Sequence, residues 1–223
     1  MQTTQPEQVL TEISKDKERI EKYRAYWESI TPANNEEVFW RYVFSFLSVH
    51  TAWSTNVRAY NLLRANRDVW FNDPIKLAEL IKTSGVGLDI QRNKGILKFK
   101  DQFFQNPDFF KVRIDENWQQ GRNRIMQECV GLGLAKTAFA LEMCFPLQSQ
   151  TVCLDTHMLQ LYGYSPKEVH KGGSNKTRYM LMEKHWIDTC NEMGVPAYIA
   201  RCLFWDMKQK QTDSRYWSYV LEK

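Results

Sequence analysis

Apolar residues recur at intervals of three, four and seven along most of this chain, and this periodicity restricts the fold more than any other feature. Between residues 7 and 30 they are Val9, Leu10, Ile13, Ile20, Tyr23, Trp27 and Ile30. Such spacing places apolar side chains along one stripe of an α-helix, so we expect one helix over residues 7–30. A sustained period of two, typical of strands, is absent from the sequence. The pattern predicts an all-α protein of roughly ten helices.

Helix-ending and helix-starting residues divide the rest of the chain. Pro32 ends the first helix, and residues 36–49 are apolar on nearly all sides, which predicts a buried helix. Asp73, followed by proline, opens a short helix that Gly85 closes. Residues 165–178 are expected to form a loop. Further helices are expected at 51–66, 88–105, 121–130, 136–145, within 154–164, and at 179–193 and 197–209.

The composition is that of an ordinary globular protein, with 223 residues of which 43% are hydrophobic and 25% charged. The formal net charge of +4 is compatible with a polyanionic partner but does not require one. No apolar run reaches the roughly 20 residues of a membrane span, and the first residues lack an apolar signal core. We therefore expect a protein that is not secreted and resides in the cytoplasm, with the nucleoid, or in a nucleus.

The cysteines exclude several kinds of site. There are five, an odd number, and none forms a C-x-x-C pair: Cys129, Cys144, Cys153, Cys190 and Cys202. Zinc ribbons, iron–sulfur loops and disulfide frameworks need closer or paired spacing. Free, buried thiols in a reducing compartment are expected.

The stretch Val130–Ala138, "VGLGLAKTA", combines a glycine turn with the start of a helix. Glycines without Cβ atoms let a phosphate approach the unpaired N–H groups of a helix N-terminus. For a G-x-G pattern alone, a tight turn that needs positive φ is the simpler explanation. Lys136 stands in the first helical turn, where the helix dipole disfavours a cation. The neutral amine that this favours is a nucleophile.

A second signal is "TVCLDTHMLQLYGY", in which Asp155 follows an apolar segment and precedes a helix. An N-cap is a sufficient structural role for Asp155. The residue lies 19 positions after Lys136, with one helix and a connection between them. An amine that attacks a carbon, together with a carboxylate that stabilises the developing positive charge, suits displacement of a leaving group.

These two motifs together resemble the helix-hairpin-helix DNA glycosylases, the group that contains endonuclease III and 8-oxoguanine DNA glycosylase. Lys136 and Asp155 match the hairpin lysine and the aspartate of the bifunctional members, with Lys-Thr-Ala and Leu-Asp-Thr-His intact. The hairpin departs from the usual pattern, because its proline is absent and two residues separate Gly133 from Lys136. Either the hairpin carries an extra residue or its glycines are displaced by one.

The resemblance extends weakly over most of the chain and implies a fold. It implies a single glycosylase domain over residues 1–223, made of two helical subdomains with an active-site cleft between them. A helical subdomain with the hairpin would span approximately 45–160, and residues 1–44 with 161–223 would form the second.

The resemblance also implies a reaction. The chain would be a bifunctional DNA glycosylase/AP lyase that flips an oxidised base, 8-oxoguanine first, out of duplex DNA. Lys136 would attack C1′ and form a Schiff base, and Asp155 would stabilise the oxocarbenium character of the sugar. The partner would be double-stranded DNA containing a damaged base, bound by a monomer with no membrane association.

Further site residues follow from the resemblance. The hairpin amides would hold a phosphate, and its carbonyls a monovalent cation, at Gly131, Gly133, Leu134 and Ala135. His50 would fill the gap left by the flipped base, unless it is a capping or core residue, and His157 would contact DNA. Phe204 or Trp205 would stack on the base, although each is more often a core residue. Phosphate contacts would come from basic residues that could equally form a solvated face, namely Arg92, Lys94, Lys98, Lys171 and Lys176.

The resemblance favours the branch without a cofactor, since the cysteine spacing does not suit the iron–sulfur cluster of the endonuclease III branch. Two other functions stay open. One is an enzyme that modifies a hypermodified pyrimidine without cutting the glycosidic bond. The other is a non-catalytic DNA-binding module in which Lys136 is structural.

Overall fold

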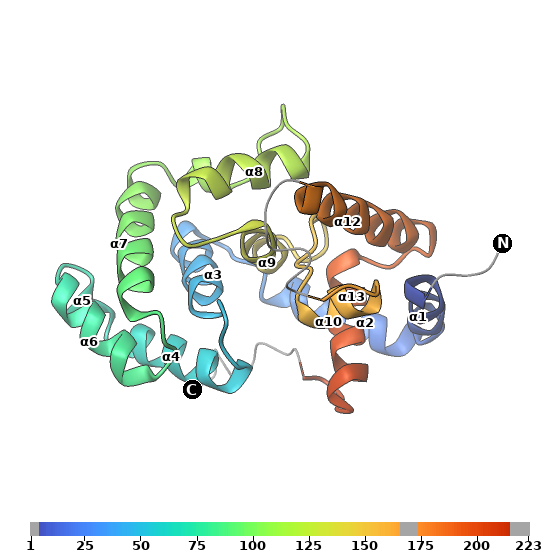
Figure 1. Ribbon diagram of the computed structural model, residues 1–223, viewed down its shortest axis with the longest axis horizontal. Helices are drawn as coiled ribbons and strands as arrows, with labels where there is room; N and C mark the ends of the chain where they lie inside the picture. The colour runs from blue at the N-terminus through green and yellow to red at the C-terminus, as the bar shows by residue number, and fades with distance from the viewer. Residues whose placement is uncertain (1–4, 166–173, 215–223) are drawn as a thin grey trace. The chain divides into compact units, whose positions relative to one another are not determined.

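The computed structural model of the protein describes residues 5–165 and 174–214, and all regular elements of these residues are helical (Figure 1). This confirms the predicted all-α class. The described residues form two compact units: unit 1 contains residues 5–31, 145–165 and 174–214, and unit 2 contains residues 32–144. Within these residues, no helix combines the length and apolarity that a membrane span requires.

Unit 2 is organised around one buried helix. Its elements are α3 (Asn35–Leu47), α4 (Trp53–Ala65), α5 (Arg67–Trp70), α6 (Pro74–Ser84), α7 (Asp89–Gln105), the 3-10 helix η1 (Pro107–Phe110), α8 (Trp118–Glu128) and α9 (Leu134–Cys144). Every residue of α3 from Val38 to Leu47 is buried, which confirms the prediction from its apolar pattern. Helix α3 packs against α4, α7 and α9, so it supports the second helix of the hairpin.

Several helix ends in unit 2 follow from local sequence. Asp73 accepts hydrogen bonds from the N–H groups of Ile75 and Lys76, and Gly85 ends α6 with φ of 76°. Both ends were predicted. Helix α8 begins three residues earlier than its expected start at 121, because Asn117 and Gln120 form a reciprocal capping box.

Unit 1 contains α1 (Gln5–Lys15), α2 (Lys17–Ser29), α10 (Thr156–Leu161), α12 (Ser174–Glu192) and α13 (Ala197–Gln209). Helix α13 packs against α1, α2 and α12. Trp27 and Trp186 are fully buried, and the Trp186 indole donates a hydrogen bond to the carbonyl of Ala197 at 3.1 Å. Helix α13 is therefore the central helix of this unit.

Two expected boundaries in unit 1 are wrong. The expected helix over 7–30 is broken at Asp16, which caps α2 by accepting from the N–H of Arg19 at 3.2 Å. The apolar stripe continues across this break, so periodicity alone does not reveal it. Helix α12 begins at Ser174, inside the segment expected to be a loop.

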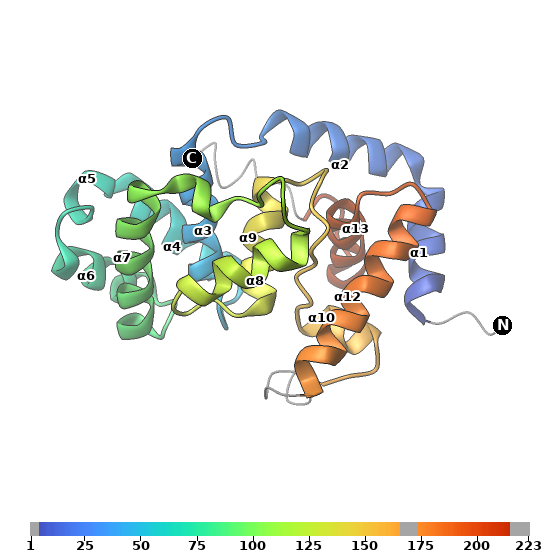
Figure 2. The ribbon, with the colours of Figure 1, turned by 90° about the horizontal axis from the view of Figure 1, so that it is seen from above.

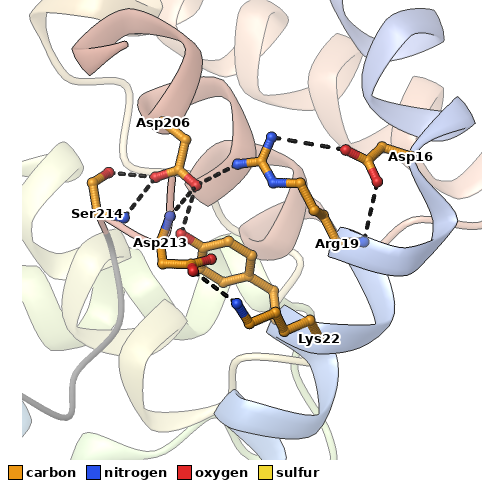
Figure 3. A network of polar contacts seen from close by, with 7 residues as sticks. Asp16, Arg19, Lys22, Asp206, Asp213 and Ser214 are labelled. Atoms are coloured by element: carbon orange, nitrogen blue, oxygen red, sulfur yellow. Dashed lines mark hydrogen bonds and ion pairs between the residues drawn. The ribbon is translucent and has the colours of Figure 1, made fainter. Parts of the chain in front are cut away.

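A buried carboxylate ties α13 to α2 (Figure 3). Asp206, 2% exposed, accepts from the Arg19 guanidinium at 2.6 Å and from the Tyr23 hydroxyl at 2.8 Å. It also accepts from the backbone N–H groups of Asp213 and Ser214 and from the Ser214 hydroxyl. The polar contacts fix the turn after α13 and offset the cost of burying the charge.

The two units divide the chain differently from the expected subdomains. The expected boundary near residue 44 falls inside α3, but all of α3 belongs to unit 2 because it packs on α9. Residues 145–160, expected with the hairpin, belong to unit 1.

Candidate active site

The glycine turn between α8 and α9 has the geometry of a helical hairpin (Figure 2). Its two glycines have different structural roles. Gly131 has φ of 100°, in the left-handed region that favours glycine. Gly133 is not among the positive-φ residues, and a Cβ placed on it would meet no atom within 4 Å. Gly131 thus makes the turn, whereas Gly133 leaves open space beside the backbone.

The N-terminus of α9 presents backbone donors next to that space. The first bonds of the helix run from the N–H groups of Lys136 and Thr137 to the carbonyl of Gly133, at 3.1 and 2.9 Å. The N–H groups of Leu134 and Ala135 precede these bonds and have no carbonyl partner within the helix. Leu134 and Ala135 are half-buried, and Gly131 and Gly133 are exposed. This arrangement suits an anion such as a phosphate.

Lys136 is held by contacts at both ends. Its backbone carbonyl accepts a 2.6 Å hydrogen bond from the hydroxyl of Ser45 on α3. The residue is half-buried, and its amine lies 5.5 Å from the centre of the Phe139 ring, one turn further along α9. The first contact fixes the backbone, and the ring contact favours one orientation of a side chain that in water would be free to rotate.

Asp155 is the N-cap of α10, as its position suggested, and one of its oxygens has a different environment from the other. Oδ1 accepts from the N–H groups of His157 and Met158 at 3.0 and 3.1 Å. Oδ2 lies 3.6 Å from Nη1 of Arg201, whose side chain is only 4% exposed. The cap therefore occupies one oxygen, and the Asp155 side chain remains 20% exposed.

The segment before Asp155 is fixed by α12. Glu183 accepts from the N–H of Val152 at 2.9 Å. The Tyr179 hydroxyl donates to the carbonyl of Val152 and accepts from the N–H of Leu154 at 3.3 Å. The backbone groups of this segment, which has no regular secondary structure, are thus satisfied by buried side chains, and Asp155 begins its helix from a fixed position.

Sequence reasoning missed these supporting residues. Glu183 and Tyr179 are buried far from Asp155 in sequence, and no local pattern reveals them. Arg201 did carry a signal, because it interrupts the otherwise apolar run "AYIARCLFW". A charged residue on the buried face of a helix needs partners, and Asp155 is one of them.

The expectation that Arg92 contacts phosphate is wrong. Arg92 is 3% exposed, and its guanidinium donates to the carbonyls of Phe46, Val86, Gly87 and Val49 and to the Thr51 hydroxyl. Burial lowers the pKa of Arg92 to about 10. These carbonyls lie in the turns around two residues of positive φ, His50 (50°) and Leu88 (47°). Arg92 is thus a structural residue that holds two turns.

The other expected residues lie as follows. His50 is exposed, which excludes the core alternative, and Lys94 and Lys176 are exposed too. Lys98 lies 4.0 Å from Glu128. Lys171 falls outside the described residues. Phe204 is a core residue, 2% exposed and near Trp186, whereas Trp205 is half-buried with its ring 4.9 Å from that of His157.

Lys136 belongs to unit 2 and Asp155 to unit 1. The five cysteines are buried free thiols, as expected. Among the described residues, no three histidine, cysteine, aspartate or glutamate side chains form a group suited to a metal ion.

No protein-family model matches the chain, and no curated protein matches it in sequence. Its helical arrangement nevertheless defines a known class: the chain has the fold of 8-oxoguanine DNA glycosylases. Two solved structures share it. The enzyme of Thermotoga maritima is 18% identical, with a TM-score of 0.67 over 92% of this chain and 100% of that one. The enzyme of Methanocaldococcus jannaschii is 17% identical, with a TM-score of 0.71 over 92% and 95% of the two chains. The all-α fold of this glycosylase group, which the sequence resemblance implied, is confirmed.

Proposed function

We propose that this protein is a DNA glycosylase that removes an oxidised base from duplex DNA and then nicks the strand. The favoured substrate in this proposal is 8-oxoguanine. One observation carries the proposal: an oriented lysine amine stands in the first turn of the hairpin's second helix, beside free backbone donors. Two solved structures with this fold are both described as 8-oxoguanine DNA glycosylases.

In this proposal the hairpin holds the DNA backbone and Lys136 performs the chemistry. A phosphate binds at the N–H groups of Leu134 and Ala135, and the open side of Gly133 admits it. The neutral Lys136 amine attacks C1′, and the base leaves with the electron pair of the glycosidic bond and takes up a proton. The sugar ring opens to a Schiff base, β-elimination expels the 3′ phosphate, and hydrolysis releases Lys136.

Asp155 has an electrostatic role in this proposal. Positive charge develops on the sugar as the base departs, and a fixed carboxylate lowers the energy of that state. The Asp155 oxygen Oδ2 is not used by the helix cap. The reaction needs no metal or other cofactor, because the lysine supplies the covalent step. A monomer that binds damaged duplex is sufficient.

Borohydride trapping tests the proposal directly. Reduction of the Schiff base should link wild-type protein covalently to a duplex containing 8-oxoguanine, whereas Lys136→Gln should form no adduct. A matched control is Lys184→Gln, since Lys184 is an exposed lysine on α12 with an ion pair to Asp188. A robust adduct with Lys136→Gln would overturn the assignment of the nucleophile.

A lesion panel, analysed with and without alkali or heat, separates the steps. Strand breaks without treatment report the lyase step, and breaks that appear only after treatment report base removal alone. If no lesion is excised although duplex DNA binds normally, the chain is a non-catalytic binding module. Intact DNA with a mass-shifted base would instead identify a base-modification enzyme.

A further inference from the structure

The carboxylate of Asp155 is restrained unequally by its helix. Both capping bonds, from the N–H groups of His157 and Met158, end on the same oxygen, Oδ1. These bonds limit rotation of the carboxylate about its Cβ–Cγ bond through one oxygen only. A contact on Oδ2, the oxygen that the cap does not use, limits the same rotation from the other side.

Arg201 provides a charged partner on that side. Its Nη1 lies 3.6 Å from Oδ2 of Asp155. The guanidinium also lies 5.2 Å from the centre of the Tyr198 ring on the same helix. A buried guanidinium costs several kcal/mol to desolvate unless it is paired, and the Arg201 side chain is 4% exposed. A buried cation held on an aromatic ring is a rigid partner for the carboxylate.

A second contact on the same face of α13 supports this assignment. Trp205 follows Arg201 by four residues, so both side chains lie on one face of the helix. The Trp205 ring lies edge to face with that of His157, with centroids 4.9 Å apart. Asp155, the N-cap of α10, and His157, in its first turn, thus meet successive turns of α13.

We propose that Arg201 is a positioning residue for Asp155: it holds Oδ2 in one orientation so that the carboxylate faces the reacting sugar. The inference rests on the proposed glycosylase function. Because a cation beside Asp155 also weakens its negative field, Arg201 acts through orientation and not through added charge. Its removal should therefore slow the chemical step without weakening DNA binding.

Single-turnover excision of 8-oxoguanine tests the inference with Arg201→Met, Arg201→Lys and the surface control Lys184→Met. A misplacement of about 1 Å can cost up to about 100-fold in rate. Arg201→Met should slow base excision 10- to 100-fold, with the protein concentration for half-maximal rate changed less than about threefold. Arg201→Lys should recover part of the lost rate, since its ammonium can still pair with Oδ2, and the control should match wild type.

The Asp155→Asn background shows whether Arg201 acts through Asp155. Coupled residues are not additive, so adding Arg201→Met to Asp155→Asn should slow excision no further. An additive loss, or a wild-type rate in Arg201→Met, overturns the inference. Melting temperatures verify folding, and Arg201→Gln replaces Arg201→Met if the latter does not fold. Absence of excision by wild-type protein would contradict the proposed function itself.

Discussion

Gly95 on α7 lies so close to the carbonyl oxygen of Val130 that a Cβ on Gly95 would fall 2.5 Å from that oxygen. The same Cβ would fall 3.1 Å from an edge carbon of Phe46. The turn of the hairpin is therefore packed against the backbone of α7, with no room for a side chain between them. This contact sets the position from which the hairpin starts.

Replacement of Gly95 by alanine should destabilise the protein. Alanine favours a helix by up to about 1 kcal/mol relative to glycine, but overpacking against backbone costs about 1–3 kcal/mol. The clash should prevail, and denaturant unfolding should show a net loss of about 1–2 kcal/mol. Gly133→Ala, whose Cβ meets no neighbour, is the control. Equal stability of the two variants would contradict the close packing.

The two hairpin glycines should respond differently to alanine. Gly131→Ala should lose about 1–2 kcal/mol of stability because its φ of 100° is strained for an L-residue. Gly133→Ala should fold normally but bind duplex DNA about tenfold more weakly, the equivalent of one hydrogen bond to a charged group. Fluorescence anisotropy at constant salt measures the affinity. Wild-type binding by Gly133→Ala would mean that no phosphate approaches there.

Substitutions should separate the structural role of Asp155 from its role in the chemistry. Asparagine caps a helix as well as aspartate does, whereas alanine costs about 1 kcal/mol. Asp155→Asn and Asp155→Ala should therefore slow base excision to a similar extent, while Asp155→Ala is less stable by about 1 kcal/mol. Both variants lose the charge that faces Arg201, so this loss does not contribute to the difference in stability between them. Normal excision by Asp155→Asn would leave Asp155 with a capping role alone.

The Asp206 network should contribute much more to stability than its exposed neighbour. Asp206→Asn removes the charge to which Arg19 and Tyr23 donate, and hydrogen bonds to a charged group are worth about 1.5–3 kcal/mol. Lys22→Met removes an exposed ion pair with Asp213, worth about 0–1 kcal/mol. Urea unfolding of both variants measures the difference. Similar losses of stability in the two variants would show that the buried Asp206 network contributes no more than an exposed ion pair.

Buried cysteines should be unreactive in the native protein. Burial raises the pKa of Cys129 and of Cys144 to about 12, so almost none of either thiol is ionised near pH 7.5. Because the thiolate is the reactive form, the five thiols should react slowly with a disulfide reagent such as DTNB and rapidly after unfolding. Fast labelling of the native chain at this pH would contradict their burial.

The sequence by itself determined what depends on neighbouring residues. The 3.6-residue spacing of apolar side chains predicted the helices and the burial of α3, and Asp73 and Gly85 marked the ends of α6. The hairpin turn and the cap by Asp155 were also readable, since each involves residues within a few positions. Helix formation, capping and glycine turns are local interactions, so a local pattern is sufficient to predict them.

Tertiary structure decided which polar side chains face solvent and which are buried. Arg92 and Lys94 look alike in the sequence, yet Arg92 is enclosed by carbonyls and Lys94 is exposed. Arg201 meets Asp155 from a helix 46 positions further along the chain. A charged group can be buried only where distant segments supply its partners, and helical periodicity carries no information about those segments.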